Sequence, residues 1–147
     1  MVNATPRAHD STPFLRQAWV LVLAVGAAHG VMLSRGLVWD DPLILNHMRL
    51  TGFWRLFEPD YFGFIRPGKV LLFSLAAHLF GSWAPGWQAL SLLILMTASL
   101  VLLRFAREFL PPAGALAAAL VYAVHPLHVE ATGWFSAMNG TALVAVS

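Results

Sequence analysis

Three apolar stretches dominate this sequence and restrict the folds that it can adopt. They cover residues 18–34, 86–105 and 113–129. A helix that crosses a bilayer needs about 20 predominantly apolar residues, so each stretch approaches the required length. The few Gln, Ser and Thr residues among them can hydrogen-bond within a helix or to a neighbouring helix. We therefore predict an all-α polytopic membrane protein with about three transmembrane helices.

The composition agrees with a membrane protein and excludes several other classes. The chain is 59% hydrophobic and 11% charged, which is unlike a soluble domain. Nine Lys and Arg residues against seven Asp and Glu residues give a net charge of +2, so no basic face for nucleic acid is expected. The absence of cysteine excludes disulfides, thiolate metal sites and a cysteine nucleophile.

The distribution of arginine predicts the orientation of the chain. Residues 1–17 are too long and too polar for a signal peptide, so the first stretch is expected to be a retained anchor. Arginines flank this stretch and close the second one, which places residues 1–17 and the turn at 106–112 in the cytoplasm. Residues 35–85 then form an outer loop. Residues 130–147 form an outer segment and the start of a further helix, so the chain is expected to be a truncated fragment.

Residues 69–80 are apolar but too short to span a membrane comfortably. We predict that they form an interfacial helix within the outer loop. The alternative is a fourth crossing, which would place Asp40 and His125 on opposite sides of a hydrocarbon core about 30 Å thick. With three crossings, Asp40, Arg66 and His125 lie near the same membrane face and can share one polar cleft.

An acidic pair, Asp40 and Asp41, follows the first apolar stretch. Asp41 and Pro42 are typical of a helix start, which is one explanation of the pair. The functional explanation is that one carboxylate acts as a general base or that the pair binds a divalent metal ion. Asp40 and Asp41 are therefore candidate catalytic residues and candidate metal ligands, and a divalent metal is a candidate cofactor.

Two further groups of polar residues border apolar segments. His125, His128 and Glu130 form a candidate polar cluster, since ionisable groups at the rim of a membrane helix are functional candidates; capping or helix pairing is the structural alternative. Arg66 and Lys69 could hold a phosphate, although cations at an interface also place their charges in water for purely structural reasons.

The order of these elements resembles the N-terminal part of the GT-C membrane glycosyltransferases. The likeness is closest to the transmembrane O-mannosyltransferases with tetratricopeptide repeats and to their bacterial relatives. It rests on the acidic pair, on Arg66 and Pro67, and above all on the segment HPLHVEATGW, which starts at His125 and ends at Trp134. Two departures are the small number of spans and the lack of a repeat region.

The resemblance implies a sugar transfer at the outer membrane face. Asp40 or Asp41 would be the catalytic carboxylate, and the donor would be a sugar linked to a polyprenyl phosphate. The acceptor would be a hydroxyl of a protein or glycan, and the transfer would be inverting. Membrane lipid is a further expected partner. Abundant Ala, Leu, Gly and Arg suggest a bacterial inner membrane with the site facing the periplasm.

Two other functions stay open from the sequence. A non-enzymatic membrane subunit or scaffold would use the charged loop to dock a partner, and its acidic pair would tolerate substitution. A metal-dependent membrane hydrolase would use His125, His128 and Glu130 as zinc ligands, although HxxHxE is not a specific zinc motif.

Overall fold

The fold of this chain is helical throughout its described part. The computed structural model describes residues 11–39, 41–51, 59, 63 and 65–134, and these residues contain no strand, which confirms the all-α class. The helices are α1 (Ser11–His29), the 3-10 helix η1 (Gly30–Ser34), α2 (Asp41–Thr51), α3 (Pro67–Phe80), α4 (Ala84–Phe109), α5 (Pro112–Ala123) and α6 (His128–Gly133).

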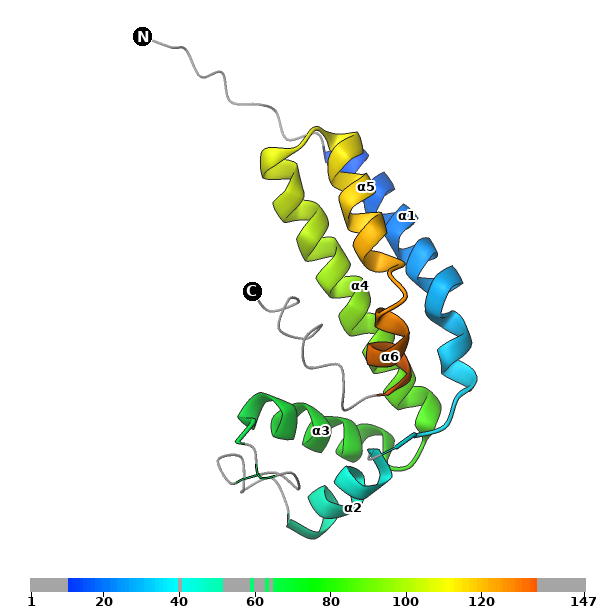
Figure 1. Cartoon of the computed structure of the whole chain (residues 1–147), viewed down its shortest axis with the longest axis vertical. Helices are drawn as coiled ribbons and strands as arrows, with labels where there is room; N and C mark the ends of the chain where they lie inside the picture. The colour runs from blue at the N-terminus through cyan, green and yellow to red at the C-terminus, as the bar shows by residue number, and fades with distance from the viewer. Residues whose placement is uncertain (1–10, 40, 52–58, 60–62, 64, 135–147) are drawn as a thin grey trace.

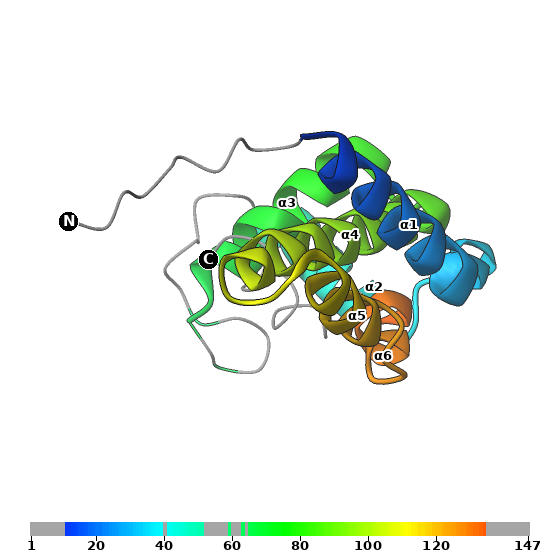
Figure 2. The ribbon, with the colours of Figure 1, turned by 90° about the horizontal axis from the view of Figure 1, so that it is seen from above.

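Helices α1, α4 and α5 pack side by side into an elongated bundle (Figure 1). Helix α1 runs from one end of the bundle to the other, α4 runs back, and α5 with α6 runs in the direction of α1 again. Seen from above, α5 lies against both α1 and α4 (Figure 2). This chain path places α2, α3, the start of α4 and α6 toward the same end of the molecule, which we call the loop end.

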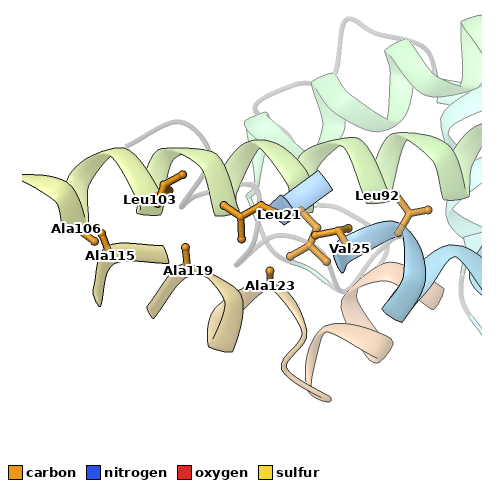
Figure 3. Packing of buried hydrophobic residues seen from close by; sticks show 9 residues of the cluster. Leu21, Val25, Leu92, Leu103, Ala106, Ala115, Ala119 and Ala123 are labelled. Atoms are coloured by element: carbon orange, nitrogen blue, oxygen red, sulfur yellow. The ribbon is translucent and has the colours of Figure 1, made fainter. Parts of the chain in front are cut away.

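The bundle core combines large side chains from α1 and α4 with alanines from α5. Leu21 and Val25 of α1 share one core with Leu92 and Leu103 of α4. Ala115, Ala119 and Ala123 present one small face of α5 to this core at a spacing of four residues (Figure 3). Residues four apart lie on one side of a helix. Small side chains on that side let two helix backbones approach closely, which is how helices associate in lipid.

Two helical stretches are long and apolar enough to cross a membrane. They are Phe14–Ser34 and Ala84–Phe109. Buried residues make up only 22% of the most apolar part of the first stretch and 39% of that of the second, so both helices keep apolar surface that the rest of the structure does not fully cover. Such an apolar surface is unfavourable in water and favourable in lipid. The two helices therefore indicate an association with membranes.

Helix α3 lies across the loop end of the bundle instead of running parallel to α4 (Figure 1). It starts at Pro67, which suits a first helical turn, and ends at Phe80, directly before Gly81, whose φ of 56° favours glycine. Val70 and Phe73 on its buried face share one core with Ile44 of α2 and Trp87 of α4. This crosswise placement is what an interfacial helix requires, while its position relative to a membrane stays a prediction.

The third predicted span differs from the continuous helix expected over residues 113–129. Helix α5 ends at Ala123, and α6 begins only at His128. Pro126 explains the break, because proline lacks an N–H donor and disfavours helical geometry in the residue before it. Helix α5 is therefore a shorter apolar helix of 12 residues, followed by a turn and by a six-residue helix.

The alanine face of α5 yields a matched pair of substitutions. Ala119→Leu should lower the stability of the detergent-solubilised protein by about 1–3 kcal/mol, because the fully buried Ala119 leaves no room for a larger side chain. Ala118→Leu, on the exposed side of the same helix, should leave the melting temperature unchanged. Thermal unfolding followed by circular dichroism measures both; equal melting temperatures would contradict this packing.

Candidate functional site

The acidic pair lies where the chain enters α2. Asp40 is outside the described residues. Asp41 is the first residue of α2 and is buried, with 1% of its surface exposed. Its backbone N–H donates a hydrogen bond of 3.1 Å to the carbonyl oxygen of Val38. The helix-start explanation of Asp41 and Pro42 is therefore correct for the backbone, and it leaves a catalytic role of either carboxylate untested.

Residues 36–39, which precede the acidic pair, meet residues 133 and 134 at the end of α6. We call this contact the junction. The indole rings of Trp39 and Trp134 lie with centroids 6.1 Å apart and with an angle of 32° between their planes. Trp39 directly precedes the acidic pair, and Trp134 follows the last residue of α6. The structure thus brings two segments together that are far apart in the sequence and that both carried predicted site residues.

Gln88 of α4 forms the centre of this junction. Its side chain is fully buried, and its Nε2 atom donates to the carbonyl oxygens of Gly36 and Gly133, each at 3.4 Å. A buried amide donor that reaches two carbonyls ties both segments to α4. Its Oε1 atom is buried without a hydrogen-bond partner among the described residues. A β-carbon added at Gly133 would lie 3.3 Å from the sulfur of Met32, so α6 and η1 are in close contact.

The predicted histidines lie at the break between α5 and α6. His125 is exposed in the turn, and its Nδ1 atom accepts a hydrogen bond of 3.3 Å from the N–H of Leu127. His128 starts α6. The centroid of its ring lies 6.4 Å from that of His125 and 4.6 Å from that of Tyr122. A third imidazole, His29 of α1, lies 6.5 Å from His128. The sequence-based cluster thus gains His29 and Tyr122.

His29 connects α1 to the broken end of α5. Its Nε2 atom lies 3.0 Å from the carbonyl oxygen of Ala123, the last residue of α5. A carbonyl only accepts, so Nε2 carries a proton. Nδ1 is buried without a hydrogen-bond partner in the described part of the chain. His29 therefore satisfies a carbonyl that the interrupted helix leaves without its regular partner.

His128 lies outside both helices that are long enough to cross a membrane. Its partial burial lowers its pKa below the ordinary value for histidine, and the neighbouring His29 and His125 act in the same direction, because a second positive charge nearby would be unfavourable. A hydrogen bond to the backbone of Tyr122 opposes these effects. The imidazole of His128 is thus held toward its neutral form, in which one ring nitrogen can accept a proton.

The two predicted phosphate-binding cations lie at the start of α3. Arg66 directly precedes Pro67 and is partly buried. Lys69 is buried in the first turn, and its Nζ atom lies 5.6 Å from the centre of the Phe73 ring. A cation over an aromatic face is stabilised there, so Lys69 contributes to the packing of α3. A role in phosphate binding stays a prediction for both residues.

The described residues offer no group of three or more His, Cys, Asp or Glu side chains that could hold a metal ion. Glu130 is exposed on α6, and the structure does not bring it together with His125 and His128 as a set of metal ligands. The zinc interpretation of these three residues therefore has no geometric support. A metal at the acidic pair stays untested, because Asp40 lies outside the described part.

Sequence reasoning did not select three residues that organise this site. His29 and Gln88 are polar residues within the first two apolar stretches, and a polar side chain inside an apolar helix usually has a partner. That signal was available for both. No comparable signal identified Trp39, because its contact with Trp134 depends on how α4 and α6 pack.

The hydrogen bond of His29 yields a stability prediction. His29→Phe should destabilise the protein by about 1–3 kcal/mol, because the buried carbonyl of Ala123 loses its donor. His29→Gln should recover part of the loss, since an amide can still donate. His78→Phe is the matched control, because His78 is exposed on α3. The measurement is the melting temperature in detergent, and equal effects of the two Phe substitutions would refute the role of His29.

Comparison with known proteins gives one informative similarity. No family model matches the chain, and no solved structure matches it. The protein O-mannosyl-transferase TMTC3 of Mus musculus is 30% identical over 130 residues, an alignment that includes 79% of this chain. The chain spans 14% of the length of that relative. The similarity indicates a distant relationship to a glycosyltransferase.

Proposed function

We propose that this chain is the N-terminal part of a membrane glycosyltransferase. It would help to move a sugar from a polyprenyl-phosphate donor to an acceptor hydroxyl at the outer membrane face. The observation that carries the proposal is the similarity to a protein O-mannosyl-transferase over most of the chain. The junction adds support, because it places the segment before the acidic pair against the end of the HPLHVEATGW segment.

The acidic pair would supply the general base of an inverting transfer. One carboxylate removes the proton from the acceptor hydroxyl, the acceptor oxygen attacks the anomeric carbon, and the bond from that carbon to the phosphate oxygen breaks. The phosphate leaves with the bonding electron pair. The burial of Asp41 at the start of α2 favours a positioning role for this residue, which makes Asp40 the stronger candidate for the base.

The leaving phosphate needs positive charge nearby, and Arg66 and Lys69 at the start of α3 are the candidates. The exposed side of α3 carries Leu71, Leu75 and Leu79, spaced four residues apart. A helix with one apolar face exposed can lie in a membrane interface. We place the lipid chain of the donor along this face, with its phosphate toward the start of the helix.

The membrane in which the reaction occurs is a separate question. Composition favoured a bacterial inner membrane with the site facing the periplasm. The relative is a mouse protein, so the comparison does not add support for a bacterial membrane. The chemistry proposed here needs only an outer membrane face with access to a lipid-linked sugar.

The acidic pair provides the direct test of this function. In the full-length enzyme, Asp40→Asn should abolish transfer of the sugar to the acceptor, because an amide cannot take up the hydroxyl proton. Asp41→Asn should reduce transfer and also lower the melting temperature, since Asp41 is buried where α2 begins. Radiolabelled sugar incorporation into the acceptor measures transfer. Pro59→Asn, at an exposed position of the same loop, is the control.

The outcomes separate the proposed enzyme from a scaffold. Retained transfer in the double variant with Asp40→Asn and Asp41→Asn would remove the pair from the mechanism. A full-length protein that binds no lipid-linked sugar and transfers none would favour the non-enzymatic membrane subunit instead.

The cysteine-free sequence permits a clean test of topology. Single cysteines at Gly36 and Ser82 flank α2 and α3, and one at Glu108 lies near the opposite end of α4; all three positions are exposed or adjoin exposed residues. Three crossings predict that a membrane-impermeant maleimide labels the cysteines at 36 and 82 from the same side and the one at 108 from the other side. Labelling of 36 and 82 from opposite sides would mean that α3 crosses the membrane.

A further inference from the structure

Trp39 has an unusual backbone conformation. Its φ angle is +55°, and it is the one residue other than glycine with a positive φ in the described part of the chain. Bulky side chains avoid this region because the β-carbon crowds the backbone. Such strain persists where the surrounding structure enforces it, and it often occurs at functional sites. The position of Trp39 directly before the acidic pair therefore needs an explanation.

The indole of Trp39 is also unusually accessible. It is 85% exposed, although one side contacts Trp134 with ring centroids 6.1 Å apart. Burial in a core therefore cannot be the reason for the strained backbone. The conformation instead holds a broad apolar ring beside its partner indole and next to two carboxylates in the sequence.

The partner indole is held firmly by its surroundings. Gln88 donates to Gly133, the residue before Trp134, and also to Gly36, three residues before Trp39. The N–H of Trp134 donates a hydrogen bond of 2.9 Å to the carbonyl oxygen of Glu130. One buried side chain thus fixes the backbone on both sides of the indole pair, which keeps the two rings together.

We propose that Trp39 and Trp134 form a stacking platform for the pyranose ring of a sugar. A pyranose ring has faces of C–H bonds, which pack on the electron-rich face of an indole. Trp39 offers such an exposed indole face, and the neighbouring ring of Trp134 extends it. The identity of this sugar as the one that is transferred rests on the proposed function.

A membrane anchor is the competing explanation of an exposed tryptophan, since indoles gather at membrane interfaces. Trp83 fits that explanation. It is 61% exposed at the start of α4, has an ordinary φ of −77°, and packs on Phe80. An anchor needs no strained backbone and no second indole, so Trp39 and Trp83 should behave differently when they are replaced.

The test is sugar binding to the full-length protein in lipid nanodiscs, measured by saturation-transfer difference NMR with methyl α-D-mannopyranoside. The wild type should transfer saturation to the ring protons of this probe, and Trp39→Asn should reduce the signal about threefold or more, because asparagine tolerates a positive φ but offers no ring face. Trp83→Asn is the matched control and should keep the signal. Mannitol, an open-chain polyol, should show little transfer with any variant.

Stability measurements guard against a trivial loss of structure. Trp39→Asn and Trp39→Gly relieve the backbone strain, so both should melt at or above the wild-type temperature while the NMR signal falls. Should either unfold, Trp39→Phe decides, because it keeps a ring and should keep part of the signal. Equal signals from the wild type and Trp39→Asn, or equal signals from the mannoside and mannitol, would overturn the platform.

Kinetics of the full-length enzyme identify the source of the sugar. A higher KM for a polyprenyl-phosphate mannose donor in Trp39→Asn, with a smaller change in kcat, assigns the platform to the donor sugar. A higher KM confined to a glycan acceptor assigns it to the acceptor. No change in either KM overturns the proposal. The NMR experiment detects sugar binding and does not depend on glycosyl transfer. A failure of the proposed activity would therefore be seen separately, in the acidic-pair variants.

Discussion

The need to satisfy an interrupted helix inside an apolar bundle governs much of this structure. In hydrocarbon, a backbone carbonyl without a partner is costly, so a helix can break there only where another group reaches its end. His29 of α1 reaches the carbonyl of Ala123 at the end of α5. Gln88 of α4 does the same for Gly133, the end residue of α6. The break therefore persists because α1 supplies a side chain to the end of α5, and α4 supplies one to the end of α6.

This arrangement also explains why the break belongs to the candidate site. The turn between α5 and α6 exposes His125 and brings His128 beside His29 and Tyr122. A continuous helix over the same residues would carry these side chains on its surface at regular spacing. Its last residue would then lie farther along the helix axis. The interruption instead lets α6 turn its last residue toward Gln88, which sets Trp134 against Trp39.

The sequence predicted the helical class and the two long apolar helices because hydrophobic length is a local property. It also predicted a short helix near residues 69–80, whose start at Pro67 and end at Gly81 have recognisable residues. It did not specify the break in the third stretch, because the apolar run continues beyond the turn at Pro126. The polar contacts of His29 and Gln88 could not be derived, since they depend on which helices become neighbours after packing.

The junction combines rigid and strained elements in a way that favours binding over stability. Gln88 and the α6 hydrogen bonds hold the backbone on the Trp134 side, while Trp39 occupies a conformation that asparagine or glycine would adopt at lower cost. Stability alone does not account for the tryptophan, because most of its surface gains nothing from burial. A ligand that covers the indole face would account for it. The same reasoning distinguishes Trp39 from Trp83, whose ordinary backbone carries no such cost.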